Sequence, residues 1–170
     1  MASPTPAERR RSTDKVVAYL AAALSMPAER VGESFRVATP GDITKILELR
    51  RETLGNDLTW DDEKYWHWKY LEQPEIGDGE IPCWVFEKGE EIIGGMGFER
   101  VQLNVKGKIH PAVWNYDVMV RPDYEGRGLG VLMNLVFQER FPLLVGLGTN
   151  ERSTRMVERL FTRLPSLRCW

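Results

Sequence analysis

The feature that most constrains this chain is a glycine-rich turn between a strand pattern and a helical pattern. In "DVMVRPDYEGRGLGVLM", residues 117–133, glycine occupies every second position from Gly126 to Gly130. Glycine has no Cβ and adopts positive φ without strain, so its amide can face a ligand unobstructed. Amides that converge at the start of a helix also meet the positive end of its dipole. The stretch therefore predicts a strand, an anion-binding loop and a helix over residues 131–140.

A phosphate or diphosphate is the ligand that suits such a loop, with Arg127 as an additional donor. The phosphate loop of P-loop NTPases requires Gly-x4-Gly-Lys-Ser/Thr, and this sequence has no such run. The dinucleotide fingerprint Gly-x-Gly-x-x-Gly also fails, because Val131 and Met133 stand where the third glycine belongs. A plain surface turn that joins strand to helix is the alternative to an anion site.

The rest of the chain alternates between helical and strand periods. Helices are expected over residues 13–24, 42–54, 61–73 and 150–164, and strands over residues 34–38, 83–87, 92–105, 109–120 and 143–148. Two hairpins join the second, third and fourth strands. This order predicts an α/β fold with a central, mostly antiparallel sheet flanked by helices. We expect residues 1–33 to form a tail, irregular over residues 1–11, and an extra helix, and residues 34–170 to form one domain.

The N-terminal apolar run, residues 16–26, has the size of a signal-peptide core. Charged residues precede it and Pro27 follows it without a small-x-small cleavage site, so we interpret it as an amphipathic helix capped by Ser12 or Thr13. No apolar run approaches the ~20 residues that span a bilayer. We therefore expect no membrane association.

The charge and cysteine content exclude several classes of partner. With 170 residues and a net charge of −2, the chain has no basic footprint for nucleic acid. The two cysteines, Cys83 and Cys169, have no CxxC spacing, and two histidines are too few to complete a zinc site with them. We expect no metal ion, reduced thiols and a cytoplasmic location.

Residues 117–133 resemble the acetyl-CoA-binding motif of the GCN5-related N-acetyltransferase (GNAT) family. The family has an apolar strand, Val-x-Pro, and then Arg/Gln-x-x-Gly-x-Gly/Ala before a helix. The expected order of strands is also similar, over about residues 35–164. The resemblance implies an acyl-CoA-dependent N-acyltransferase that moves acetyl from acetyl-CoA to a primary amine of a small molecule.

The resemblance also implies roles for individual residues. The strand residues Val118, Met119 and Val120 would run beside the pantetheine arm. The diphosphate would be held by the loop residues Glu125, Gly126, Arg127, Gly128, Leu129, Gly130 and Val131. The thioester end would be lined by Asn150 and Ser153 at the start of the last helix. The N–H of Met119 or Val120 would stabilise the oxyanion. Asp117 is the candidate general base. Its alternatives are a strand carboxylate paired with a neighbour such as Arg100, and a water relay without a dedicated base.

Three departures from the family pattern favour a second interpretation. Glu125 stands where the family has Arg or Gln, and Val157 stands where many relatives carry a tyrosine acid. The sequence given stops at Trp170, so the two C-terminal strands of the family are expected to be missing. The alternative is a non-catalytic CoA-binding or assembly module, as a homodimer or with a partner chain that completes the sheet.

Two further clusters carry predictions. The aromatic run "YWHWKY", residues 65–70, is either core packing or a platform for the acceptor. Gly94, Gly95 and Gly97 within one strand indicate a bulge or a close backbone approach.

Overall fold

The computed structural model of the chain describes residues 6–55, 63–72, 81–146 and 151–162. Its helices and strands in chain order are α1 (Pro6–Leu24), α2 (Ala28–Glu33), β1 (Phe35–Val37), η1 (Pro40–Asp42), α3 (Ile43–Leu54), α4 (Glu63–Leu71), β2 (Cys83–Lys88), β3 (Glu91–Val105), β4 (Lys108–Val120), η2 (Pro122–Tyr124), α5 (Leu129–Arg140), β5 (Leu144–Gly146) and α6 (Glu151–Leu160). The elements η1 and η2 are short 3-10 helices.

One sheet with the strand order β1-β2-β3-β4-β5 forms the centre of the fold. The first three pairings are antiparallel, and β5 lies parallel to β4. The predicted α/β class with a mostly antiparallel sheet is confirmed. The pairing of β4 with β5 extends from Val113 to Asn115, where Asn115 faces Gly146. The remaining part of β4, as far as Val120, lies beyond these paired residues.

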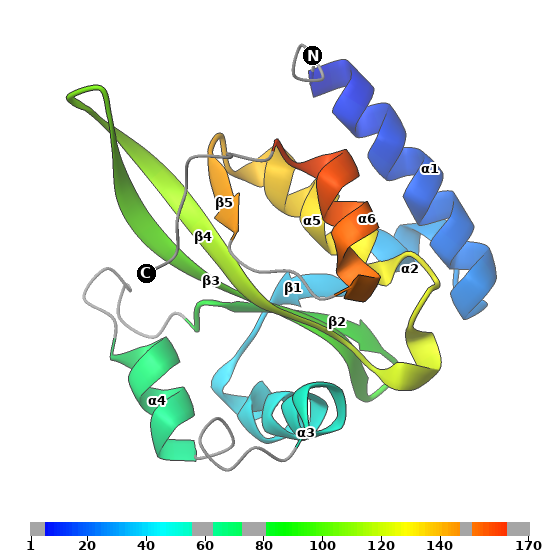
Figure 1. The fold of residues 1–170 in the computed structure, drawn as a ribbon. Coiled ribbons are helices and arrows are strands. Elements are labelled where there is room, and N and C mark those ends of the chain that lie inside the picture. The colour runs from blue at the N-terminus through cyan, green and yellow to red at the C-terminus, as the bar shows by residue number, and fades with distance from the viewer. Residues whose placement is uncertain (1–5, 56–62, 73–80, 147–150, 163–170) are drawn as a thin grey trace.

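Helices cover both faces of the sheet (Figure 1). The helices α1, α2, α5 and α6 lie on one face, and α3 and α4 lie on the other. Two buried clusters fill the two interfaces. Phe137 of α5 is central to the first cluster, which also contains Phe98 of β3, and Leu49 of α3 belongs to the second, with Met119 of β4. Consequently, β4 contributes side chains to both layers, with Val113 in the first cluster and Met119 in the second.

The N-terminal segment is more regular than the sequence predicts. The prediction that residues 1–11 lack regular structure is wrong from Pro6 onward, where α1 begins. Proline is favoured in the first turn of a helix, and Glu8 complements the helix dipole there. The predicted cap by Ser12 or Thr13 is also wrong. Ser12 donates to the Glu8 carbonyl within the helix, and Thr13 donates to the Glu139 carboxylate of α5.

The N-terminal helices take part in the main core. Leu20 and Leu24 of α1 and Val31 of α2 are buried in the cluster around Phe137. The helix α2 is only six residues long and was not predicted from the sequence. Among the described residues, none of the helices has both the length and the apolar character needed to cross a bilayer.

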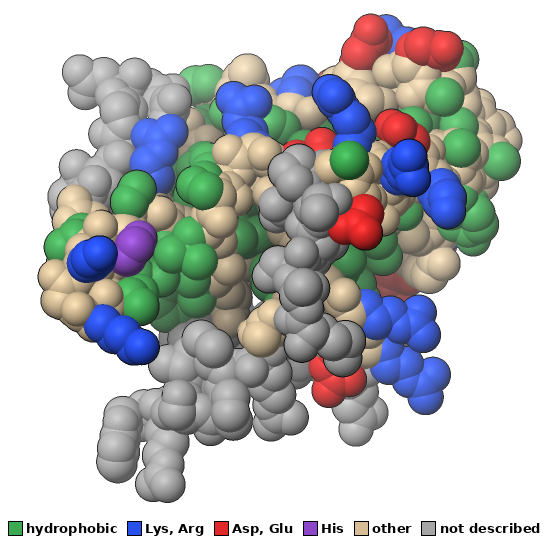
Figure 2. Space-filling model, turned by 90° about the horizontal axis from the view of Figure 1, so that it is seen from above, with side chains coloured by type: hydrophobic (Ala, Val, Ile, Leu, Met, Phe, Trp, Pro, Cys, Tyr) green, Lys and Arg blue, Asp and Glu red, His purple; other side chains and the backbone are tan. Residues whose placement is uncertain are grey.

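Most predicted boundaries agree with the structure to within two residues. The helix α5 begins at Leu129, two residues before the prediction, because Gly128 adopts the left-handed conformation at its N-cap. Parts of three predicted elements lie outside the described residues, namely residues 61–62 and 73, 147–148, and 150 with 163–164. Figure 2 views the molecule from above, and basic, acidic and hydrophobic side chains are interspersed on that face.

The glycines of β3 permit a close approach, as predicted, and lie opposite a bulge in β4 between Tyr116 and Met119. The register between β3 and β4 shifts between Gly95 and Gly97. A Cβ on Gly97 would lie 2.7 Å from both the Tyr116 ring and the Tyr70 hydroxyl, so this position requires glycine. The missing side chain at Gly97 leaves room for Tyr70 of α4, whose hydroxyl reaches Asp117.

Candidate functional site

The glycine loop links the end of β4 to α5 and contains a row of successive backbone amides. Gly126 and Gly128 have φ values of +73° and +85°, a region that favours glycine. The N–H groups of residues 126–131 donate to no acceptor among the residues that the structure describes. The last three of these belong to the first turn of α5, whose positive dipole end adds to the attraction for an anion.

The side chains around the loop come from several elements. The Arg127 guanidinium donates from Nη1 to the Ala23 carbonyl at 3.2 Å and lies 5.4 Å from the centre of the Tyr124 ring. The ring of Tyr19 in α1 lies 3.6 Å from where a Cβ of Gly128 would be. Glu125 is exposed. The extra N-terminal helix therefore borders the loop directly.

The helix α6 lies beside the start of α5. The sulfur of Met156 is 3.6 Å from where a Cβ of Gly130 would be. Ser153 and Val157 are half-buried on the same helix. Asn150, the residue expected at the start of this helix, lies outside the described residues. Ser153 therefore lies on a helix that neighbours α5, the helix that follows the loop.

The two sides of β4 carry different groups. Val120 packs against the cluster on the α5 side, and Met119 is buried in the cluster on the α3 side. By alternation Val118 also faces the α5 side, where it is 37% exposed. The predicted pantetheine strand therefore presents an accessible surface beside the glycine loop.

Asp117 faces the opposite layer and is held by three donors. Its Oδ2 accepts hydrogen bonds from Arg50 Nη1 at 2.6 Å, Lys69 Nζ at 2.8 Å and the Tyr70 hydroxyl at 2.7 Å. Asp117 has a φ of +49°, which is strained for a residue with a side chain. These contacts offset that strain. The alternative partner from the sequence analysis, Arg100, lies on another part of the sheet.

The electrostatics of this cluster follow from its burial and its charges. Burial raises the pKa of Asp117, but the Lys69 ammonium, the Tyr70 hydroxyl and the Arg50 guanidinium outweigh it and leave that pKa below its usual value. Burial, together with the Asp117 charge, raises the pKa of Tyr70. Asp117 is therefore ionised and Tyr70 protonated at neutral pH.

The aromatic run of α4 divides as its helical spacing indicates. Trp66 and Tyr70 are fully buried and stack with ring centres 4.8 Å apart. Trp68 is 61% exposed, and its ring centre lies 5.6 Å from that of Tyr65. One face of the helix is therefore core packing, and the other carries Tyr65 and the exposed Trp68.

The GNAT acetyltransferase domain model matches residues 34–139, more than half of the chain. The chain belongs to the GNAT family. The matched residues include the glycine loop and all of β4, which are the parts of the fold that carry the family motif. A comparison with curated protein sequences finds no match.

Solved GNAT structures share this fold. A GCN5-related N-acetyltransferase from Ralstonia eutropha JMP134 is 19% identical, with a TM-score of 0.59 over 79% of this chain and 95% of its own. A GNAT acetyltransferase from Brucella melitensis, solved with acetyl-CoA, is 18% identical, with a TM-score of 0.51 over 72% and 79%. The enzyme AAC(6')-Iy, solved with a CoA bisubstrate analogue, is 12% identical, with a TM-score of 0.54 over 80% and 94%.

Sequence reasoning missed two buried asparagines at this GNAT site. Asn115 of β4 and Asn134 of α5 face each other between the sheet and the helix, with Asn115 Nδ2 3.3 Å from Asn134 Oδ1. Each interrupts an apolar run, "AVWNYDVMV" or "VLMNLVF". A polar residue at an apolar position was the signal that could have found them.

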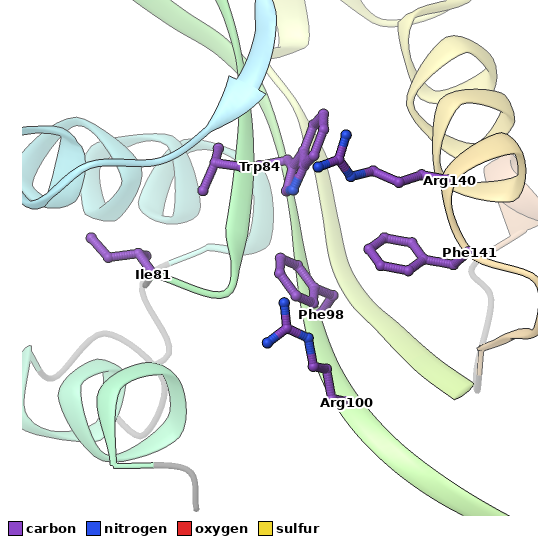
Figure 3. A pocket seen from close by; sticks show the side chains of 7 residues that line it. Ile81, Trp84, Phe98, Arg100, Arg140 and Phe141 are labelled. Carbon is purple, nitrogen blue, oxygen red and sulfur yellow. The ribbon is translucent and has the colours of Figure 1, made fainter. Parts of the chain in front are cut away.

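A separate pocket of about 390 Å³ lies near the C-terminal end of α5 (Figure 3). Trp84 and Phe98 of the sheet, Phe141 after α5, and the guanidinium groups of Arg100 and Arg140 line it, together with Val37 and Ile81. The Arg140 guanidinium lies 5.1 Å from the centre of the Trp84 ring. None of the predicted cofactor residues lines this pocket.

Proposed function

We propose that this GNAT protein is an N-acetyltransferase that moves the acetyl group of acetyl-CoA to a primary amine of a small molecule. The observation that carries the proposal is the row of amides at residues 126–131, which lack acceptors among the described residues and open α5. A diphosphate supplies both the acceptors and the negative charge that such a site favours. The acetyl-CoA bound to the Brucella relative supports the same cosubstrate here.

The edge of β4 next to the loop suits the pantetheine arm. The N–H of Arg121 donates to Ile93 on β3 at 2.9 Å. Because successive N–H groups of a strand point to opposite sides, the N–H of Val120 points away from β3 and toward the β5 side. An extended arm can hydrogen-bond there as an added strand would. Of the two predicted oxyanion donors, we therefore favour Val120 over Met119.

The proposed reaction joins two ligands from opposite faces of the sheet. Acetyl-CoA lies on the α5 side, and the amine comes from the α3 and α4 side beside Asp117 and Trp68. The amine nitrogen loses a proton to a base or water and attacks the thioester carbonyl. A C–N bond forms and the C–S bond breaks, and the thiolate takes a proton from solvent. Proximity of the two ligands supplies most of the rate.

The identity of the base stays a prediction. Asp117 is a weaker base than a free carboxylate because its three donors lower its pKa. A water relay needs no dedicated side chain and fits the same geometry. An Asp117→Asn variant separates these roles. If Asp117 is the base, kcat falls by roughly 10² or more while acetyl-CoA affinity stays the same.

A non-catalytic CoA-binding module is the alternative function, and Val157 at the position of the family's tyrosine acid favours it. To distinguish the two, the protein is mixed with acetyl-CoA and a panel of primary amines, including amino sugars and polyamines, and free CoA thiol is measured. We expect thiol release that depends on the amine. Binding of acetyl-CoA without release for any amine would contradict the enzyme proposal and support the module.

A further inference from the structure

Three basic side chains surround η2, the short helix that leads into the glycine loop, and they differ in whether carboxylates neutralise them. Arg121 Nε lies 3.0 Å from Glu52 Oε2, and Arg121 Nη1 lies 3.8 Å from Glu91 Oε1. Lys88, the last residue of β2, and Arg127, in the loop, form no ion pair within the part of the chain that the structure describes. Two positive charges beside the loop are therefore available to an anion.

Lys88 and Arg127, called the cation pair below, meet at one aromatic ring. Lys88 Nζ lies 5.2 Å and Arg127 Cζ lies 5.4 Å from the centre of the Tyr124 ring. Arg127 is also held by α1, because its Nη1 donates to the Ala23 carbonyl at 3.2 Å. Contact with a ring face restrains a cation and leaves N–H groups free to donate to an anion. The two charges are thus positioned in advance, next to Gly126.

The cation pair suits a phosphate group that is distinct from the diphosphate. CoA carries a third phosphate on the 3′-oxygen of its ribose, and this ribose is attached directly to the diphosphate. A phosphate monoester has a charge of about −1.5 to −2 at pH 7 and three acceptor oxygens, which ammonium and guanidinium donors match. The exposed carboxylates of Asp123 and Glu125 on the same turn limit the attraction, so a moderate effect is expected.

We propose that Lys88 and Arg127 bind the 3′-phosphate of CoA and make the protein discriminate CoA from 3′-dephospho-CoA. This inference rests on the proposed function, which places the diphosphate at residues 126–131, one ribose away. Lys88 comes from the turn between β2 and β3, outside the glycine loop, and acts as a specificity-determining residue. Lys88 is half-buried and Arg127 is exposed, so water and salt screen both charges, and each contributes about threefold to affinity.

Calorimetric titration with CoA and with 3′-dephospho-CoA at low salt tests this proposal. We expect the wild-type protein to bind 3′-dephospho-CoA about tenfold more weakly than CoA, and this ratio to fall below about threefold in 0.5 M salt. Lys88→Gln should reduce the ratio at low salt to about threefold, and Lys88→Gln with Arg127→Gln should bind both ligands equally. Lys108→Gln, an exposed lysine at the other end of β4, is the matched control and should retain the tenfold ratio.

The outcomes separate the inference from the function on which it rests. If wild-type protein binds CoA and 3′-dephospho-CoA equally, the inference is wrong and the proposed function stands. The inference also fails if Lys88→Gln retains the tenfold ratio, if Lys108→Gln loses it, or if salt leaves it unchanged. If wild-type protein binds neither ligand, the proposed function fails together with the inference. The ratio is measured within each variant, so a general loss of stability does not imitate the expected result.

Discussion

The polar groups on the two sides of β4 differ in whether the protein itself supplies their hydrogen-bond partners. On the α3 and α4 side, Asp117 is saturated by Arg50, Lys69 and Tyr70, so the protein satisfies this charge itself. On the α5 side, the amides of residues 126–131 have no acceptors among the described residues, and Asn115 Oδ1 has no donor. The Asp117 carboxylate therefore has protein partners, whereas the loop amides are available to a ligand.

This contrast indicates where stability and binding reside. Polar groups with protein partners hold the structure together, and removing one leaves its partners buried and unpaired. Polar groups without partners are available to a ligand, and changing them should alter affinity more than folding. Variants on the α3 and α4 side should therefore lose stability, whereas variants on the α5 side should lose affinity for acetyl-CoA.

The largest effect is expected for Asp117→Ala. Arg50 is 3% exposed, so loss of the carboxylate leaves a buried cation and lowers the free energy of unfolding by about 3 kcal/mol. Urea denaturation measures this change, and Glu90→Ala, in the exposed turn between β2 and β3, should stay within about 0.5 kcal/mol of wild type. A loss of acetyl-CoA affinity in a folded Asp117→Ala protein would contradict the separation of the two sides.

Low pH should reduce the stability that the Asp117 cluster contributes on the α3 and α4 side. The folded pKa of Asp117 lies below its unfolded value of about 3.9, so its ionised form stabilises the protein above that pH. The contribution is lost as the pH falls through the folded pKa. Denaturant titrations between pH 7 and pH 2 should show a smaller acid loss of stability for Asp117→Asn than for wild type. An equal loss of stability with falling pH in the two proteins would mean that the three donors do not perturb the pKa of this carboxylate.

A smaller and different effect is expected for Gly128→Ala. A side chain at a φ of +85° costs roughly 1 kcal/mol and displaces the loop amides, so acetyl-CoA affinity should fall about tenfold. Gly107→Ala is the matched control, because Gly107 has a φ of +82° in the turn between β3 and β4. It should lose similar stability and no affinity. Equal affinity losses for both variants would show that the loop has no special role.

The smallest effect is expected for Arg127→Ala. The guanidinium is exposed and already donates to the Ala23 carbonyl, so its attraction for a diphosphate is screened by water and salt. We expect acetyl-CoA affinity to fall about threefold at low salt and less at 0.5 M salt. A loss of a hundredfold would place the main anion contact on this side chain and not on the amides.

Local patterns predicted much of this fold. The glycine loop, the strand order and the close approach at Gly97 each depend on residues that are close in sequence or on a simple alternation. The start of α1 at Pro6 was missed because early prolines and an arginine run also fit an irregular tail. The length of α2, six residues, leaves too little periodicity to detect.

The candidate site could be predicted only in part from the sequence, for a different reason. The partners of Asp117 lie 67 and 48 residues away, and no local pattern selects Arg50 and Lys69 over Arg100. The pairing of Asn115 with Asn134 likewise depends on how α5 packs on β4. The sequence predicted the glycine loop and the helix that follows it, whereas the side-chain partners required the tertiary structure.

Selective ¹⁵N labelling of the 15 glycines tests the central claim most directly, because amide chemical shifts report contacts at individual N–H groups. On addition of CoA, we predict large shifts for Gly126, Gly128 and Gly130 and an unchanged signal for Gly107. Single Gly→Ala variants assign the peaks. Saturating CoA that leaves the three loop glycines unshifted would contradict the claim that these amides hold the diphosphate.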